Sequence, residues 1–322
     1  MERIVQCVPN FSEGRRTDII EKIIAPLKDK KGFKLISYES DSDYNRTVVT
    51  LIGNVDSLIE PLINFFSEAL KYIDMNKHSG EHPRMGAVDV VPFIPISKIT
   101  INECVEYANL LAKEVNERFS IPVYLYANAC KYPERENLPT IRSGEFEGMK
   151  EKIKENNWYP DFGEAKIHDT FGVVAIGARM PLIAFNVDLN TNDEKIANKI
   201  AKMIRKSSGG FQYVQAGPAY LADKGHVQVT MNILNYKKNP IYRIFETIIM
   251  EARRFNVEVI SSELIGLCPK DALLRSIHYY LDINKIIFNK DMSIEDITLY
   301  SIKYLKLRGF SKLKIIEAHL GE

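Results

Sequence analysis

LIAFNVDL (residues 182–189) opens the stretch that decides the fold, which runs to Leu264. Five further segments follow in order: DEKIANKIAKMIR (193–205), FQYVQA (211–216), HVQVTMNIL (226–234), PIYRIFETIIMEARRF (240–255) and VEVISSEL (257–264). Segments 193–205 and 240–255 carry apolar residues three and four apart, which is typical of helices. The other four are rich in β-branched and aromatic residues, which favour strands. The order β-α-β-β-α-β predicts a ferredoxin-like unit.

The residues before this stretch predict the same order once more. We expect strands at 4–8, 34–38, 47–53 and 88–94 and helices at 17–27, with Thr17 as the cap, and 55–73. A further helix from Thr100, opened by a capping box with Glu103, and a strand at 122–127 extend the unit. The pattern is weaker over 131–171, where one helix fits 145–156, and a strand follows at 173–178.

The fold class is therefore predicted as α/β, built of two α+β sandwiches. Each would be a ferredoxin-like subdomain with a mixed sheet covered by helices. We expect the first over residues 1–180 and the second over residues 181–322, with the boundary near Met180-Pro181. The chain from Asp271 onward reads as mostly helical and is expected to pack on the second unit.

Composition excludes several classes of function. The chain has 322 residues, of which 45% are hydrophobic and 26% charged, and its net charge is +1. A near-neutral balance gives no electrostatic footprint for nucleic acid, and no run reaches the roughly 18 apolar residues of a membrane span. The N-terminus has no signal-peptide layout, and no two of the four cysteines form a CxxC pair. We therefore expect reduced thiols and a cytoplasmic protein.

The segment HSGEHPRMGAVD (78–89) holds two histidines, two acids and an arginine between a predicted helix and a predicted strand. Three interpretations compete: a solvated polar loop, a metal site made by His78 and His82, or a general acid–base histidine. Pro83 disfavours the helix that would bring both histidines to one face, which counts against metal. No metal is predicted.

Other polar clusters follow strand ends or precede a helix. They lie at 10–16, at 38–46 and at 138–145, where the start of the helix predicted from 145 could receive an anion. Taken singly, each cluster is typical of an ordinary turn. Polar clusters at several strand ends of one sandwich can nevertheless converge. The sequence has no P-loop, no strand-linked GxGxxG and no GxSxG elbow, so nucleotide and serine-hydrolase chemistry are disfavoured.

The run KHSGEHPRMGAVD (77–89) resembles the signature of the formiminotransferase domain of the folate-dependent formiminotransferase-cyclodeaminases. Further stretches are similar in order and spacing from Arg3 to Leu274. They include CVPNFSEG (7–14), NRTV (45–48), PVYLY (122–126), LPTIR (138–142), WYPDFG (158–163), GAR (177–179) and LIAFN (182–186).

The resemblance implies a fold, an activity and a site. The fold would be two subdomains facing a folate-binding cleft, in a homodimer. The activity would be that of a glutamate formimidoyltransferase, which moves a formimino group between N-formimidoyl-L-glutamate and tetrahydrofolate, the co-substrate, in histidine degradation and one-carbon metabolism. The catalytic acid–base residue would be His82, and the folate-binding stretch would be Gly163, Glu164, Ala165, Lys166, Ile167, His168, Asp169, Thr170, Phe171 and Gly172.

Charged residues that complement the charges of the substrates are expected to complete this site. The family has aspartate where Glu39 aligns, so Glu39 is the expected carboxylate beside a cationic amidinium. Candidates for binding substrate carboxylates are the four arginines of the matching motifs: Arg46, Arg84, Arg142 and Arg179. Between Gly163 and Gly172 the intervening residues differ from those typical of the family.

Two other functions stay open on sequence grounds. A formyl group, from 5-formyltetrahydrofolate or N-formylglutamate, would use the same fold and site. A folate-binding protein without turnover would need the fold but not the catalytic histidine. Because the chain ends at Glu322 without a cyclodeaminase half, we expect a separate protein to deaminate the product.

Overall fold

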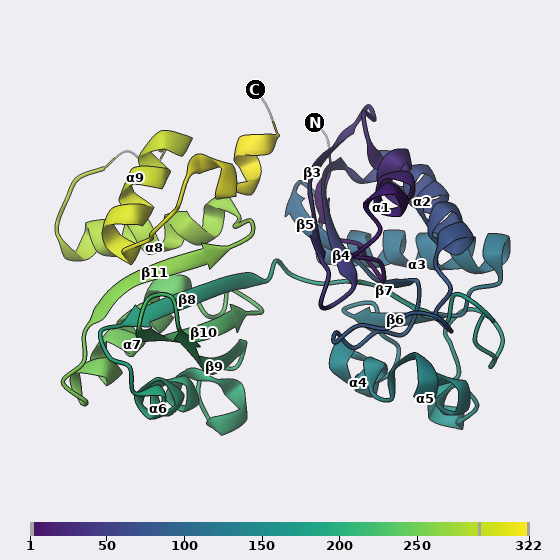
Figure 1. The fold of residues 1–322 in the computed structure, drawn as a ribbon. Helices are drawn as coiled ribbons and strands as arrows, with labels where there is room; N and C mark the ends of the chain where they lie inside the picture. The colour runs from purple at the N-terminus through teal and green to yellow at the C-terminus, as the bar shows by residue number, and fades with distance from the viewer. Residues whose placement is uncertain (1–2, 289–290, 321–322) are drawn as a thin grey trace. The chain divides into compact units, whose positions relative to one another are not determined.

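The computed structural model describes residues 3–288 and 291–320. The chain divides into two compact units, Met1–Arg179 and Met180–Glu322 (Figure 1).

The first unit is built on a mixed sheet with the strand order β3-β4-(β1, β2)-β5-β7-β6, in which β1 and β2 both lie between β4 and β5. The strands β5, β7 and β6 run parallel, and the other neighbours are antiparallel. The main elements are β1 (Ile4–Cys7), β2 (Asn10–Phe11), α1 (Thr17–Ile24), β3 (Phe33–Asp41), β4 (Arg46–Asn54), α2 (Ile59–Tyr72), β5 (Val88–Ser97), α3 (Ile101–Phe119), β6 (Val123–Ala127), α4 (Leu138–Arg142), α5 (Glu145–Lys152) and β7 (Val174–Ala178).

This arrangement confirms the ferredoxin-like prediction for the first unit. The strands β1, β3, β4 and β5 with α1 and α2 form the β-α-β-β-α-β core, and α3 with β6 and β7 extends it. The expected capping box of α3 is present, with Thr100 and Glu103 bonding each other's backbone N–H groups. The helices α1, α2 and α3 lie on one side of the sheet, where their apolar side chains form the core (Figure 1).

The face of the sheet opposite these helices carries polar residues. Paired residues of neighbouring strands point to the same face. One row across the sheet is Glu39, Val48, Asn10, Val90, Ala175 and Tyr124. Arg46 lies two residues before Val48 and therefore shares this face. We call the face opposite α1, α2 and α3 the open face.

Local details of the first unit differ from the sequence expectations. Thr17 is the first residue of α1 rather than its cap, because the Glu13 carboxylate accepts the N–H groups of Arg15 and Arg16 in front of the helix. The helix ends at Ile24 and tightens into a 3₁₀ turn over Ala25–Leu27. The chain also resumes sheet pairing at β2, where a loop was expected.

The second unit confirms the other ferredoxin-like prediction. Its sheet is antiparallel with the order β11-β8-β10-β9. The elements are β8 (Ile183–Leu189), α6 (Glu194–Ile204), β9 (Val214–Leu221), β10 (His226–Ile233), α7 (Ile241–Arg253), β11 (Val259–Ile265), α8 (Lys270–Ile283) and α9 (Ile294–Leu305). The strand predicted from Phe211 begins later, at Val214, and runs on through Pro218. The expected helical tail packs into the core of this unit through α8 and α9.

No helix in the described part of the chain is long and apolar enough to cross a membrane.

Candidate functional site on the open face of the first sheet

The loop between α2 and β5 carries both histidines of the HSGEHPRMG segment, and Arg84 fixes it. The Arg84 guanidinium binds Glu147 through two bonds of 2.8 and 2.7 Å and Glu145 through one of 2.6 Å. The N–H of Phe146 also bonds the Arg84 carbonyl at 2.8 Å. The loop is thereby fastened to the first turn of α5. The chain's own glutamates therefore supply negative charge at this helix start, and both are paired with Arg84.

His78 is a structural part of this loop. Its Nδ1 accepts from Arg84 Nε at 3.3 Å, which makes Nε2 the protonated nitrogen that donates to the Asn45 carbonyl at 2.9 Å. Burial lowers the pKa of His78, so the neutral form is favoured. The Asn45 side chain bonds Gly14 N–H and the Ser79 carbonyl, each at 2.9 Å. The two histidines therefore have different surroundings, and His78 is already committed to hydrogen bonds.

His82 is half-buried and lies among charged side chains. Burial lowers the pKa of the His82 imidazole, and the positive charges of Arg46 and Arg142 lower it further, while Asp89 opposes them. The imidazole is therefore neutral at pH 7 and able to accept a proton. The Tyr44 ring lies 5.8 Å away, centroid to centroid. A small pocket here is lined by Ser12, Tyr44, Asn45, Arg46, His78, His82, Arg84 and Asp89.

Two guanidinium groups near His82 have donors left for a ligand. Arg46 Nε and Nη2 both donate to Asn10 Oδ1, and no carboxylate of the described residues lies within ion-pair distance of Arg46. Arg142 is paired with Asp89 through Nη2, and its buried Nε has no partner among the described residues. Two cations and one carboxylate face the imidazole, which favours an anionic ligand.

Glu39 lies on the same open face as Arg46. It is exposed and sits opposite Val48, two strands away from Asn10. At the usual strand spacing this is about 10 Å. Its carboxylate has no hydrogen bond or ion pair within residues 3–288 and 291–320, so it is open to a ligand.

Arg179 and Tyr126 occupy the far part of the open face. Tyr126 is buried and pairs in register with Gly177. A Cβ atom at Gly177 would lie 2.3 Å from the Tyr126 carbonyl oxygen and 2.5 Å from its ring, so glycine is needed for this close approach of Tyr126 to β7. Burial raises the pKa of Tyr126, whereas the charge of Arg179 lowers it. The GAR motif thus seats an aromatic ring and a cation side by side.

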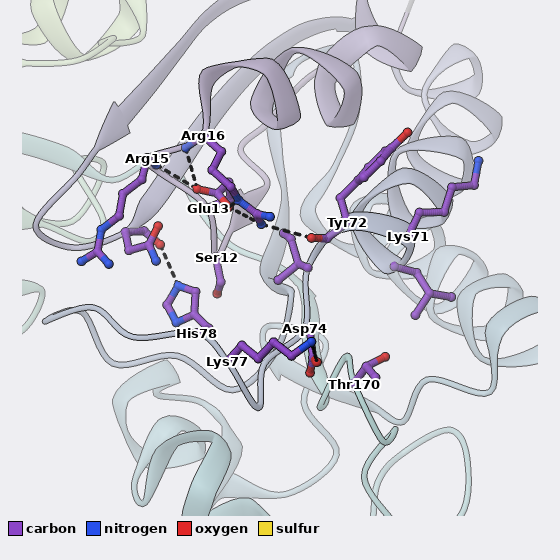
Figure 2. A pocket seen from close by; sticks show the side chains of 13 residues that line it. Ser12, Glu13, Arg15, Arg16, Lys71, Tyr72, Asp74, Lys77, His78 and Thr170 are labelled. Carbon is purple, nitrogen blue, oxygen red and sulfur yellow. Dashed lines mark hydrogen bonds and ion pairs between the residues drawn. The ribbon is translucent and has the colours of Figure 1, made fainter.

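A larger pocket of about 530 Å³ lies next to the His82 pocket and shares Ser12, Asn45 and His78 with it. Figure 2 shows Glu13 bound to Arg16, whose backbone and side chain both donate to the Glu13 carboxylate at the start of α1. His78, also labelled there, bonds the Asn45 carbonyl. The remaining lining side chains are Arg15, Leu70, Lys71, Tyr72, Ile73, Asp74, Lys77 and Thr170.

The 163–172 stretch forms a loop against the segment between α2 and β5 that carries His78 and His82, which we call the histidine loop. Thr170 O accepts from Met75 N–H at 2.8 Å, and Asp169 O accepts from the Asn76 side chain at 2.8 Å. A Cβ at Gly172 would lie 2.2 Å from Met85 O, and its positive φ also favours glycine. Ile167 and Phe171 are buried, Ala165 and His168 are partly buried, and Glu164, Lys166 and Asp169 are exposed. The stretch reaches the larger pocket through Thr170.

Sequence reasoning missed Asn10 and Asp89 as individual site residues, although both lie in segments it singled out. Their signal is burial: Asn10 is 5% exposed and Asp89 2% exposed. Each binds an arginine 36 or 53 residues away. Within the described residues, no group of three or more His, Cys, Asp and Glu side chains could hold a metal ion.

Comparison with known proteins gives matches along almost the whole chain. Residues 4–179 match the model of the formiminotransferase domain, N-terminal subdomain, and residues 184–320 match that of the formiminotransferase domain. A glutamate formimidoyltransferase of Streptococcus pyogenes is 48% identical over 91% of this chain and 98% of its own length. A glutamate formimidoyltransferase of Thermoplasma acidophilum is 42% identical over 87% of this chain and 93% of its own length. A mouse formimidoyltransferase-cyclodeaminase is 38% identical over 89% of this chain but only 54% of its own length.

Proposed function

The chain belongs to the formiminotransferase family, and we propose that it is a glutamate formimidoyltransferase that transfers the formimino group between N-formimidoyl-L-glutamate and tetrahydrofolate. One observation carries this proposal beyond the similarity: a half-buried neutral imidazole, His82, faces two guanidinium groups that have donors left for anionic substrates. Both co-substrates carry carboxylates, which such groups bind.

The reaction exchanges the amine on an amidine carbon. The secondary amine of tetrahydrofolate attacks the formimino carbon, a tetrahedral intermediate forms, and the carbon–nitrogen bond to glutamate breaks. The attacking nitrogen must lose one proton, and the leaving nitrogen must gain one. His82 accepts the first proton and donates it to the leaving nitrogen, so the histidine is regenerated. Such proton transfer contributes about 10²–10⁴-fold to the rate.

The four candidate arginines differ in what they can still bind. We assign Arg46 and Arg142 to substrate carboxylates, because both face His82 and keep unsatisfied charge or donors. Arg84 is already paired with two glutamates and is better suited to holding the loop. Arg179 lies beside Tyr126 and is proposed to contact the folate rather than the formimino donor.

Glu39 and the 163–172 stretch complete the proposed site. A cationic amidinium would be repelled by two guanidinium groups, so an opposing carboxylate is needed on the open face. Glu39 supplies one that is free of partners within the described residues. The 163–172 loop borders the larger pocket through Thr170, and that pocket is large enough for part of a folate.

The homodimer implied by the resemblance and the cytoplasmic location expected from the sequence remain predictions. All four cysteines are free thiols and three are buried, which agrees with a reducing cytoplasm.

The test is turnover with defined donors. Purified protein is incubated with tetrahydrofolate and either N-formimidoyl-L-glutamate or N-formyl-L-glutamate, and the folate product is followed by absorbance after acid conversion to the methenyl form. We expect catalytic product formation from the formimino donor, with a kcat/KM well above that for the formyl donor. Faster transfer from N-formylglutamate or 5-formyltetrahydrofolate would assign formyl transfer. Folate binding without turnover from any of these donors would make the protein a folate carrier.

A further inference from the structure

Asp89, the second residue of β5, connects the histidine loop to α4. The residue is 2% exposed. The Oδ1 atom accepts the Met85 N–H at 2.9 Å, three residues after His82, and Oδ2 binds Arg142 Nη2 at the end of α4. One buried carboxylate thus holds both the loop that carries the imidazole and the guanidinium beside it.

The Arg142 guanidinium is held on one side only. The side chain is 13% exposed, and its Nη2 is occupied by Asp89. Its Nε is buried and has no hydrogen-bond partner among the described residues. A buried N–H without a partner costs free energy, so this edge is suited to donate a hydrogen bond to an anionic oxygen.

Asp89 also sets the charge around His82. The charged groups that act on the imidazole are Arg46 from β4, Arg142 from α4 and Asp89 from β5. Together they give a net charge of about +1, and without Asp89 the charge would be about +2. The carboxylate therefore limits how far the two arginines suppress protonation of His82.

We propose that Asp89 is a positioning residue for the transfer reaction: it orients Arg142 so that the Nε edge binds a carboxylate of the formimino donor next to His82. This inference rests on the proposed function and adds to it a residue that acts through Arg142 rather than on the substrate. Because the carboxylate is bound equally before and during the reaction, Arg142 should affect KM more than kcat.

The first experiment compares Asp89→Asn with Asp161→Asn. Asp161 is a matched control, because it is 1% exposed, binds a buried arginine, Arg135, at 2.8 Å and accepts the Leu125 N–H at 2.8 Å. No contact links Asp161 to His82 within the described residues. We expect Asp89→Asn to raise the KM for N-formimidoyl-L-glutamate by about 10- to 100-fold with kcat lowered less, since charge-assisted hydrogen bonds have that strength. Asp161→Asn should lose thermal stability but keep both constants.

A second comparison separates positioning from simple charge neutralisation. If Asp89 acts through Arg142, the Asp89→Asn/Arg142→Gln double variant should have the same KM as Arg142→Gln alone. If Asp89 only competes with the substrate for the guanidinium, Asp89→Asn would bind the donor more tightly and lower KM. That result would overturn the proposal.

NMR titration of labelled histidine gives a readout that needs no activity. The His82 signal is identified by its loss in His82→Gln. The pKa of His82 should fall in Asp89→Asn and rise in Arg142→Gln, whereas a purely structural role for Asp89 would move neither. Equal His82 pKa values in the wild type and both variants would refute the role of Asp89 without refuting the proposed function. An unchanged KM in an active Asp89→Asn enzyme would do the same. A wild type without turnover but with both pKa shifts would refute the proposed function while supporting the coupling of Asp89, Arg142 and His82.

Discussion

The bond network of Arg84 allows a quantitative test of how the loop between α2 and β5, which carries His78 and His82, is held. The Arg84 side chain is 10% exposed, whereas those of Glu145 and Glu147 are 41% and 64% exposed. An exposed ion pair contributes about 0.2–1 kcal/mol, and removal of one partner from a fully buried pair costs about 3–5 kcal/mol. Here the carboxylates can regain water but the guanidinium cannot. We therefore expect a coupling energy of about 1–2 kcal/mol between Arg84 and Glu147.

The assay is a double-mutant cycle of Arg84→Gln and Glu147→Gln, followed by urea unfolding. Trp158 is the one tryptophan of the sequence and lies in the first unit, so its fluorescence reports unfolding of that unit. The matched control is Lys154 with Glu151, whose side chains are 60% and 80% exposed. Its coupling should stay below about 0.5 kcal/mol. An Arg84–Glu147 coupling no larger than the control would refute the claim that this contact fastens the loop.

Two further predictions concern pH and packing. Burial lowers the pKa of His78 below the ordinary 6.5, as it does for the other two half-buried histidines of the first unit, so the unfolded chain binds more protons than the folded one below that pH. The free energy of unfolding of the first unit should therefore fall as pH decreases from about 6.5. In melts followed by Trp fluorescence at several pH values, His78→Gln should make this dependence of stability on pH shallower. An unchanged dependence on pH would contradict the prediction. Gly177→Ala should destabilise the first unit by about 1–3 kcal/mol, because the new Cβ would meet the carbonyl oxygen and the ring of Tyr126. Gly217→Ala, which meets nothing within 4 Å, should destabilise its unit less in circular-dichroism melts, and equal losses would argue against the ring contact.

Much of the fold could be predicted from the sequence because its elements carry clear local signals. The helix opened by Thr100 and Glu103 has its capping box where expected, and Asp193 caps α6. The errors occur where tertiary contacts override local signals. Phe11 was expected in a loop, but it packs its ring against Phe65 and extends the sheet as part of β2.

The site was predictable only in part. The HSGEHPRMG loop could be singled out because histidine, proline and glycine coincide in it, whereas the choice of His82 as the acid–base residue rested on the family resemblance. The roles of the four arginines could not be ranked, because their partners lie far away in sequence: Glu147 is 63 residues from Arg84, and Asp89 is 53 residues from Arg142. Only the folded chain shows which guanidinium groups are already neutralised and which are available to substrate.

The role proposed for His82 is tested most directly by a single-turnover measurement with His82→Gln. Enzyme in excess over tetrahydrofolate is mixed with saturating N-formimidoyl-L-glutamate, and transfer is followed in the wild type and the variant, with tetrahydrofolate binding measured separately. We expect binding to be retained and the rate to fall by about 10²–10⁴-fold, which is the contribution of a general acid–base residue. A rate within about 10-fold of the wild type, with binding retained, would show that His82 is not the acid–base residue.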